Sequence, residues 1–144
     1  MRMIWIGAVL AGSLLTACNF QATLPKSDPA LNAEAEATFG DLVGSRDDAI
    51  LARMSSANDR ATVGAQLPVL RKLTGDSPPP KAKVTGFQSV TSTEGRFYSV
   101  AQEYAYPDRL AHVQTTFIKE GEAWKVMSFN VNVVMKAPSE PTEG

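Results

Sequence analysis

The 144-residue sequence predicts an α+β fold, with N-terminal helices packed on a curved antiparallel sheet of four or more strands. Two periodicities predict this class. Apolar residues recur at helical spacing as far as residue 73, and they alternate with polar residues from residue 81 onward. Residues 76–80, Asp-Ser-Pro-Pro-Pro, lie between the two halves as a rigid connector. Because the helices precede a run of strands, we expect one layer of helices on one sheet.

Residues 30–43 predict the first helix. Asp28 has the side chain of an N-cap, and Pro29 suits the first helical position because its missing N–H would have no partner there. Apolar residues follow at spacings of three and four, which gives the helix one side for a core. Gly44 is a suitable end.

Residues 46–54 and 60–73 predict two further helices. The first is short, with its apolar residues near its C-terminal end. The second is interrupted by Pro68, which predicts a kink or a restart because proline removes a backbone hydrogen bond. Gly75 follows as the expected end of the third helix.

Strands are expected over residues 81–90, 96–106, 109–119 and 123–135. Pro107-Asp108 and Glu120-Gly121 have the composition of tight turns between the last three strands. Strands of about eleven residues exceed the usual five or six, so the sheet should twist and bend strongly.

The register of the strands follows if both turns are two-residue loops. Glu103 then lies opposite His112, and Phe117 lies opposite Trp124. The concave side, which the helices would cover, receives the polar groups that could line a ligand pocket: Tyr104, Tyr106, Ser128, Asn130 and Asn132. Hydroxyls and amides over an aromatic floor suit a neutral or weakly polar small ligand, although tyrosine rings can equally fill the core.

His112 is the only histidine, and its expected pairing with Glu103 makes these two residues the one acid–base candidate. The register places the pair on the less apolar, outward side of the sheet, which argues against a sheltered catalytic site. The sequence has one histidine and one cysteine, too few of the usual ligands for a zinc site, so we expect no metal. No glycine-rich loop that could cradle a phosphate is present, and we expect no cofactor.

The N-terminus has the pattern of a secretory signal peptide, with Arg2 ahead of an apolar stretch over residues 4–15. That stretch is too short to span a bilayer as a helix, which needs about 20 residues. It ends in Leu15-Thr16-Ala17-Cys18, which resembles the lipobox of bacterial lipoproteins. The resemblance implies that the thiol of Cys18 is lipidated with diacylglyceryl and that residues 1–17 are removed.

A lipidated Cys18 would anchor the chain to a membrane of the bacterial cell envelope. In proteobacterial lipoproteins an aspartate directly after the cysteine favours retention in the inner membrane, and Asn19 stands there instead. The resemblance therefore favours the periplasmic face of the outer membrane. We expect four segments: a signal peptide (1–17), a lipidated cysteine and flexible tether (18–27), a folded domain (28–135) and a disordered tail (136–144).

The last expected hairpin carries Gly121-x-x-Trp124-x-Val126. With helices first and long strands after, this resembles the ending common in the NTF2-like (SnoaL-like, cystatin-like) superfamily, over residues 28–134. The resemblance implies a cone in which the curved sheet wraps the helices and leaves a pocket at the wide end. Enzymatic members place Asp, His or Tyr in that pocket, whereas many members only bind.

The fourteen basic and fifteen acidic residues give a formal charge of −1, which excludes a basic footprint for nucleic acid. We expect a non-catalytic, membrane-anchored envelope lipoprotein whose domain binds a protein partner or a small ligand. The sheet would also suit a homodimer. Two alternatives stay open: a small-molecule isomerase or hydrolase of the SnoaL-like type, and a structural accessory of an envelope assembly.

Overall fold

The computed structural model describes residues 25–138. Three helices, α1 (Pro29–Val43), α2 (Asp47–Arg53) and α3 (Arg60–Thr74), precede four strands, β1 (Lys83–Ser92), β2 (Gly95–Ala105), β3 (Arg109–Glu120) and β4 (Ala123–Met135). The strands form one antiparallel sheet in the order β1-β2-β3-β4. The predicted α+β class, with N-terminal helices on a four-stranded antiparallel sheet, is confirmed.

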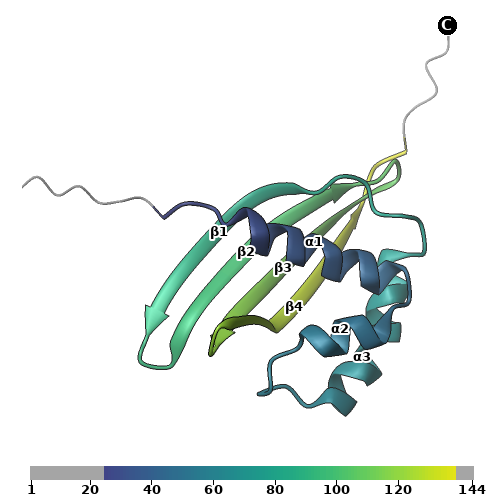
Figure 1. The fold of residues 1–144 in the computed structure, drawn as a ribbon. Coiled ribbons are helices and arrows are strands. Elements are labelled where there is room, and N and C mark those ends of the chain that lie inside the picture. Colours follow the sequence, from purple (N-terminus) through teal and green to yellow (C-terminus); the bar gives the residue numbers. More distant parts are fainter. Residues whose placement is uncertain (1–24, 139–144) are drawn as a thin grey trace, which may run out of the picture.

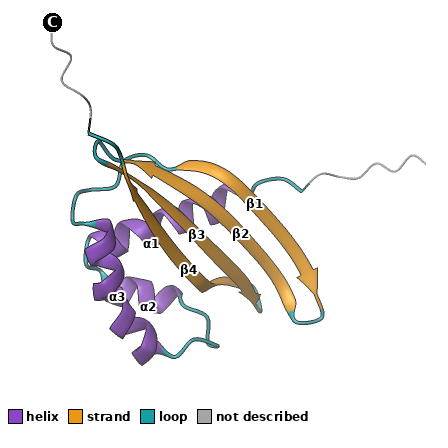
Figure 2. Cartoon of the chain, turned by 180° about the vertical axis from the view of Figure 1, so that it is seen from behind, coloured by secondary structure: helices purple, strands orange, loops and turns teal. Residues whose placement is uncertain are grey.

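The helices lie on one face of the sheet. Figure 1 shows α1 crossing the strands, with α2 and α3 gathered on the β4 side, and Figure 2 shows the opposite face bare of helices. The strands curve along their length, as ten- to thirteen-residue strands are expected to do. Helix α3 runs through Pro68 as one element, so of the two predicted outcomes, a kink or a restart, the structure excludes the restart.

Helix α1 begins where its sequence predicts. The Asp28 carboxylate accepts hydrogen bonds from the backbone N–H groups of Ala30 (3.0 Å) and Leu31 (3.1 Å), and Pro29 occupies the first turn. These two bonds satisfy N–H groups that have no partner inside the helix. Gly44 forms the C-cap.

The N-terminus of α1 is fixed to β2 by two polar side chains of that strand. The Tyr98 hydroxyl accepts from the backbone N–H of Asp28 (2.9 Å) and donates to Oδ1 of Asn32 (2.8 Å). The Gln102 amide donates to the carbonyl oxygen of Asn32 (3.0 Å). Because all these groups are partly buried, they hold the helix at one position along the strand.

Arginines join the three helices to one another. The Asp41 carboxylate of α1 is largely buried and pairs with Arg46 (2.5 Å) and with Arg53 of α2. Asp47 at the start of α2 pairs with Arg71 of α3. Because Asp41 has two arginine partners, its buried carboxylate would lose its compensation only if both were removed, which would be strongly destabilising.

The space between α1 and the sheet is filled by aromatic rings. The centroids of Phe39 and Tyr104 lie 4.2 Å apart, and both side chains are fully buried. Phe117 and Val126 are buried in the neighbouring part of the core, below the first turns of α1. The concave side of the sheet is therefore packed where these rings lie.

The β2–β3 register is the predicted one, with Glu103 opposite His112. The register of the β3–β4 hairpin differs from the predicted one by two residues. Its loop is Gly121-Glu122 instead of Glu120-Gly121, so Lys119 lies opposite Trp124. The predicted pairing of Phe117 with Trp124 is wrong. Gly121 has φ of 60°, a left-handed conformation that glycine adopts at no steric cost, and this fixes the first position of the loop.

A β-bulge then changes the alternation along β4. Phe117 lies opposite Val126, but Thr116 lies opposite Ser128, so Met127 is an extra residue without a partner in β3. Before the bulge, even-numbered residues of β4 face the helices. After it the odd-numbered residues do, and Phe129, Val131 and Val133 pack against the core.

The loop between α2 and α3 clamps this bulge. The Asn58 side-chain amide donates to the carbonyl oxygens of Val126 (3.2 Å) and Met127 (3.0 Å), and the Ser55 N–H donates to the same Val126 oxygen (2.8 Å). Met54 also forms an isolated parallel bridge with Val126. The bulge therefore keeps its carbonyl groups satisfied at the edge of the sheet.

We predict that Asn58→Ala lowers the free energy of unfolding by about 1–3 kcal/mol, because it removes two hydrogen bonds, a partly buried one to the Val126 carbonyl and an exposed one to the Met127 carbonyl. Chemical denaturation followed by circular dichroism measures the change. Asn130→Ala, on an exposed position of the same strand, is the control and should stay within about 0.5 kcal/mol of the wild type. Equal losses in the two variants would refute the clamp.

Candidate binding face of the sheet

Polar side chains cover the middle of the outer face of the sheet, opposite the helices. The register places eight polar side chains and Ala101 in three rows across β2, β3 and β4: Glu103–His112–Asn132, Ala101–Gln114–Asn130 and Ser99–Thr116–Ser128. We call these nine residues the polar strip. Within it Gln114 donates to Ser99 (3.2 Å), and the Ser99 and Thr116 hydroxyls lie 3.0 Å apart.

The structure corrects the predicted pocket residues. Ser128, Asn130 and Asn132 were expected on the concave side, but they follow the bulge at Met127 and face outward instead. The predicted placement was wrong because it assumed strict alternation between the two faces along the whole of β4. The extra residue shifts that alternation by one position. The two asparagines instead join the Glu103–His112 pair, which was expected on the outer face.

Tyr104 and Tyr106 do lie on the concave side, but both are buried in the core. The Tyr104 hydroxyl contacts Oε1 of Gln102 at 3.3 Å. Among residues 25–138, the Tyr106 hydroxyl has no hydrogen-bond partner, and the Arg109 guanidinium lies 4.0 Å from the centre of its ring. The two tyrosine rings therefore pack in the core, and their hydroxyls are not open to a ligand.

Burial raises the pKa of Tyr104, and nearby Glu36 and Tyr106 raise it further. Burial also raises the pKa of Tyr106, against the opposing charge of Arg109. Both groups therefore favour the neutral form in the folded state.

The Glu103–His112 pair is open to solvent. Nδ1 of His112 lies 3.7 Å from Oε2 of Glu103, and the two side chains are 43% and 26% exposed. At that distance the pair makes no short hydrogen bond, and water reaches both groups. In this arrangement the pair is neither closely hydrogen-bonded nor shielded from water.

A shallow hollow lies over the polar strip. Its volume is about 240 Å³, and its polar lining comes from Thr85, His112, Gln114, Asn130 and Asn132. Ala101 leaves space in the middle of the sheet, where a second hollow of about 190 Å³ adjoins over Gly86. Among the described residues, Asn130 and Asn132 have no side-chain hydrogen-bond partner, so their amides are available to a ligand.

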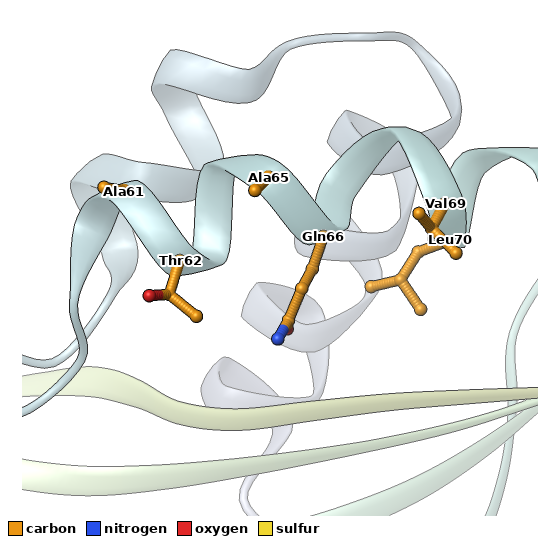
Figure 3. Close-up of a pocket in the computed structure, with 6 residues that line it drawn as sticks. All are labelled: Ala61, Thr62, Ala65, Gln66, Val69 and Leu70. Carbon is orange, nitrogen blue, oxygen red and sulfur yellow. The ribbon is translucent and has the colours of Figure 1, made fainter.

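A larger hollow lies along α3. It has a volume of about 650 Å³ and is lined by one side of that helix: Ala61, Thr62, Ala65, Gln66, Val69 and Leu70 (Figure 3). This side carries no charge, and its hydroxyl, that of Thr62, is already bonded to Asp59 (2.6 Å). The hollow offers apolar contact but no acid, base or nucleophile.

Within residues 25–138 we find no group of three or more His, Cys, Asp or Glu side chains placed to hold a metal ion. No helix in this part of the chain is long and apolar enough to cross a membrane. The lipobox Leu15-Thr16-Ala17-Cys18 lies outside the described residues.

No family model, no curated protein and no solved structure matched the chain in the three comparisons. The polar strip therefore has to be interpreted from its own geometry.

Sequence reasoning missed the bulge although the sequence contains a signal for it. The alternation of apolar residues in β4 changes phase: Trp124 and Val126 are even-numbered, whereas Phe129, Val131 and Val133 are odd-numbered. One extra residue between the two sets explains the change.

We predict that stability falls as the pH rises above about 10, the ordinary pKa of tyrosine. The sign follows from the raised pKa of Tyr104: the unfolded chain ionises first, so the stabilisation is complete below pH 10 and is lost above it. Chemical denaturation at a series of pH values measures the free energy of unfolding. Above pH 10 this free energy should decline less steeply in Tyr104→Phe than in the wild type. An unchanged decline in that variant would contradict the assignment to Tyr104.

Proposed function

We propose that the chain is a membrane-anchored lipoprotein of the bacterial envelope and that its domain is a non-catalytic module. The module binds a protein partner through the polar strip on the outer face of the sheet. The anchor would be diacylglyceryl on Cys18, and the periplasmic side of the outer membrane is the proposed location.

The observation that carries the proposal is the bare outer face. It is broad and shallow, and its two asparagine amides have no partner within the described residues. Apolar side chains frame the strip at both ends: Phe97 and Ile118 in one row, Leu110 and Val134 in another. A polar surface with partly apolar borders suits a protein partner, whereas small ligands prefer enclosed pockets.

The proposed fold family is NTF2-like. In its support, Gly121 starts the last loop with a positive φ, Trp124 is half-buried and Val126 is buried. The single helical layer on a curved antiparallel sheet also agrees with that family. The cone with a pocket at its wide end is part of the proposal, although core rings fill the space under α1.

The alternative of a SnoaL-like isomerase or hydrolase has less support. Its acid–base pair would be Glu103 and His112, which lie on the open face at 3.7 Å from each other. Water competes with substrate at such a site, and electrostatic stabilisation is weakest where the site is wet.

We predict that a photo-crosslinking amino acid at Gln114, in the middle of the polar strip, forms an adduct with one envelope protein in intact cells. Ala101→Trp in the same chain fills the hollow and should reduce that adduct at least tenfold, while the domain stays folded by circular dichroism. The adduct is identified by mass spectrometry.

The same crosslinker at Val69, in the α3 hollow, is the matched control because it is also exposed. Adducts at Val69 but not at Gln114 would move the binding surface to α3 and refute the proposed face. An adduct at Gln114 that survives Ala101→Trp would also count against it.

The anchor has its own test. We predict that membrane-extracted protein has the intact mass of a chain starting at Cys18 with added diacylglyceryl. Cys18→Ser should lose both the lipid and the association with membranes. An unlipidated wild type would overturn the anchor and leave the polar strip untouched as a binding face.

A further inference from the structure

The two edges of the sheet are protected to different degrees. The β4 edge is covered in part by the α2–α3 loop, whose donors satisfy its bulge. The outer edge of β1 has no partner strand among residues 25–138, and Figure 2 shows it on the side of the sheet away from α2 and α3. Strand β1 is ten residues long, with no proline and with Lys83 as its one charged residue. Natural proteins protect such edges, because unpaired N–H and C=O groups invite another strand.

Apolar side chains are exposed on both faces of β1. Phe87 lies opposite Val100 on the helix side of the sheet and is 37% exposed, because α1 packs over β2 and β3 and α3 packs over β4. Val90 lies opposite Phe97 on the outer face and is 41% exposed. A strand added beside β1 would cover the free backbone edge and parts of both side chains.

We propose that this added strand is β1 of a second copy of the chain, paired antiparallel about a twofold axis to give one continuous eight-stranded sheet. Directly opposite residues of an antiparallel pair lie on the same face, so the axis has to pass between two identical residues. The irregularity between Val84 and Gly86 restricts regular pairing to the part of β1 that follows it. Gln88 is the residue that we place at the axis.

The shape of the edge favours an axis at Gln88. Gly86 then lies opposite Val90 of the partner subunit. A Cβ atom added to Gly86 would meet no atom within 4 Å, and a hollow of about 190 Å³ lies over this residue, so the valine has room. On the helix side Phe87 lies opposite the small Ser89 of the partner subunit. The two Phe87 rings become diagonal neighbours, whose separation of about 7–8 Å is within reach of aromatic side chains.

The charges near the two ends of β1 identify a second copy as the occupant. Lys83 begins the strand, and Glu94 lies in the turn that follows it. Both are exposed, and neither forms an ion pair within the part of the chain that the structure describes. Antiparallel pairing brings the start of one strand beside the end of the other. Each Lys83 would therefore lie near Glu94 of the partner subunit, and the twofold axis makes this contact twice.

The proposed interface is small. Standard interfaces bury about 1,200–2,000 Å², and a single short strand pair lies at or below the low end of that range, so we expect a dimer that exchanges with monomer. The twofold axis is perpendicular to the sheet. It places the helices of both copies on one side and both polar strips on the other, where one partner assembly could contact the two strips together.

Disulfide crosslinking in cells that express the full-length chain tests both the pairing and its register. Gln88→Cys puts the two thiols at the axis, where opposite Cα atoms lie about 4.5–5.5 Å apart and a disulfide can form. Val90→Cys is the matched control on the same face of the same strand, because its two copies would lie about 13 Å apart. With a mild oxidant, Gln88→Cys should give roughly tenfold more covalent dimer than Val90→Cys. Mass spectrometry should identify the linkage as 88 to 88, and not as one to Cys18.

A second variant tests the contact at Gly86. In the Gln88→Cys chain, Val90→Lys stays soluble at an exposed position but sets a charge into the paired edge, and it should reduce the covalent dimer roughly tenfold. Val69→Lys, at an exposed valine of α3, is the control and should leave the yield unchanged.

Three results would overturn the proposal: no covalent dimer from Gln88→Cys, equal yields from Gln88→Cys and Val90→Cys, or a disulfide from position 88 to a different protein. The last result would place another chain on the β1 edge. None of these outcomes depends on the lipid anchor or on a partner of the polar strip, so the proposed function is tested separately.

Discussion

The extra residue in β4, Met127, determines what each face of the sheet presents. Without it, the alternation set by Trp124 and Val126 would point Phe129 outward and Asn130 into the core. With it, the apolar set faces the helices and the amides face solvent. A bulge at an edge strand leaves carbonyl groups unpaired, and Asn58 supplies their donors. The packing of the core and the polarity of the outer face thus depend on one clamped irregularity.

The clamp also connects the two halves of the chain. The loop that carries Asn58 begins at the end of α2, and its Ser56 N–H donates to the Glu120 carboxylate (3.1 Å) at the end of β3. Hydrogen bonds from the side chain of Ser55 and from Ser56 lower the pKa of Glu120, so this contact favours the ionised carboxylate. Residues far apart in sequence are therefore held at one corner of the sheet, next to the bulge.

Local patterns predicted most of the fold. The Asp28 cap, the helix periods and the β2–β3 register all follow from neighbouring residues, and the structure confirms them. The β3–β4 register did not follow, because two adjacent dipeptides, at 120–121 and 121–122, could both form the loop. The faces of the second half of β4 were wrong because Met127 looks like an ordinary strand residue. The phase change between Val126 and Phe129 indicates an extra residue, but the hydrogen bonds that Asn58 donates to the bulge come from another element, and spacing within β4 carries no information about that partner.

A polar outer face has a further consequence for how the domain associates. Obligate interfaces are apolar, resemble a core cut in half, and leave the separate subunit unstable. Here the helices cover the apolar core residues of β2, β3 and β4, and the polar strip is compatible with water, so the outer face does not resemble an obligate interface. Hydrogen bonds to Asn130 and Asn132 would replace bonds to water and give little net free energy each. The apolar borders at Phe97 and Val134 would have to supply the affinity, and a partner held in this way exchanges rather than staying bound.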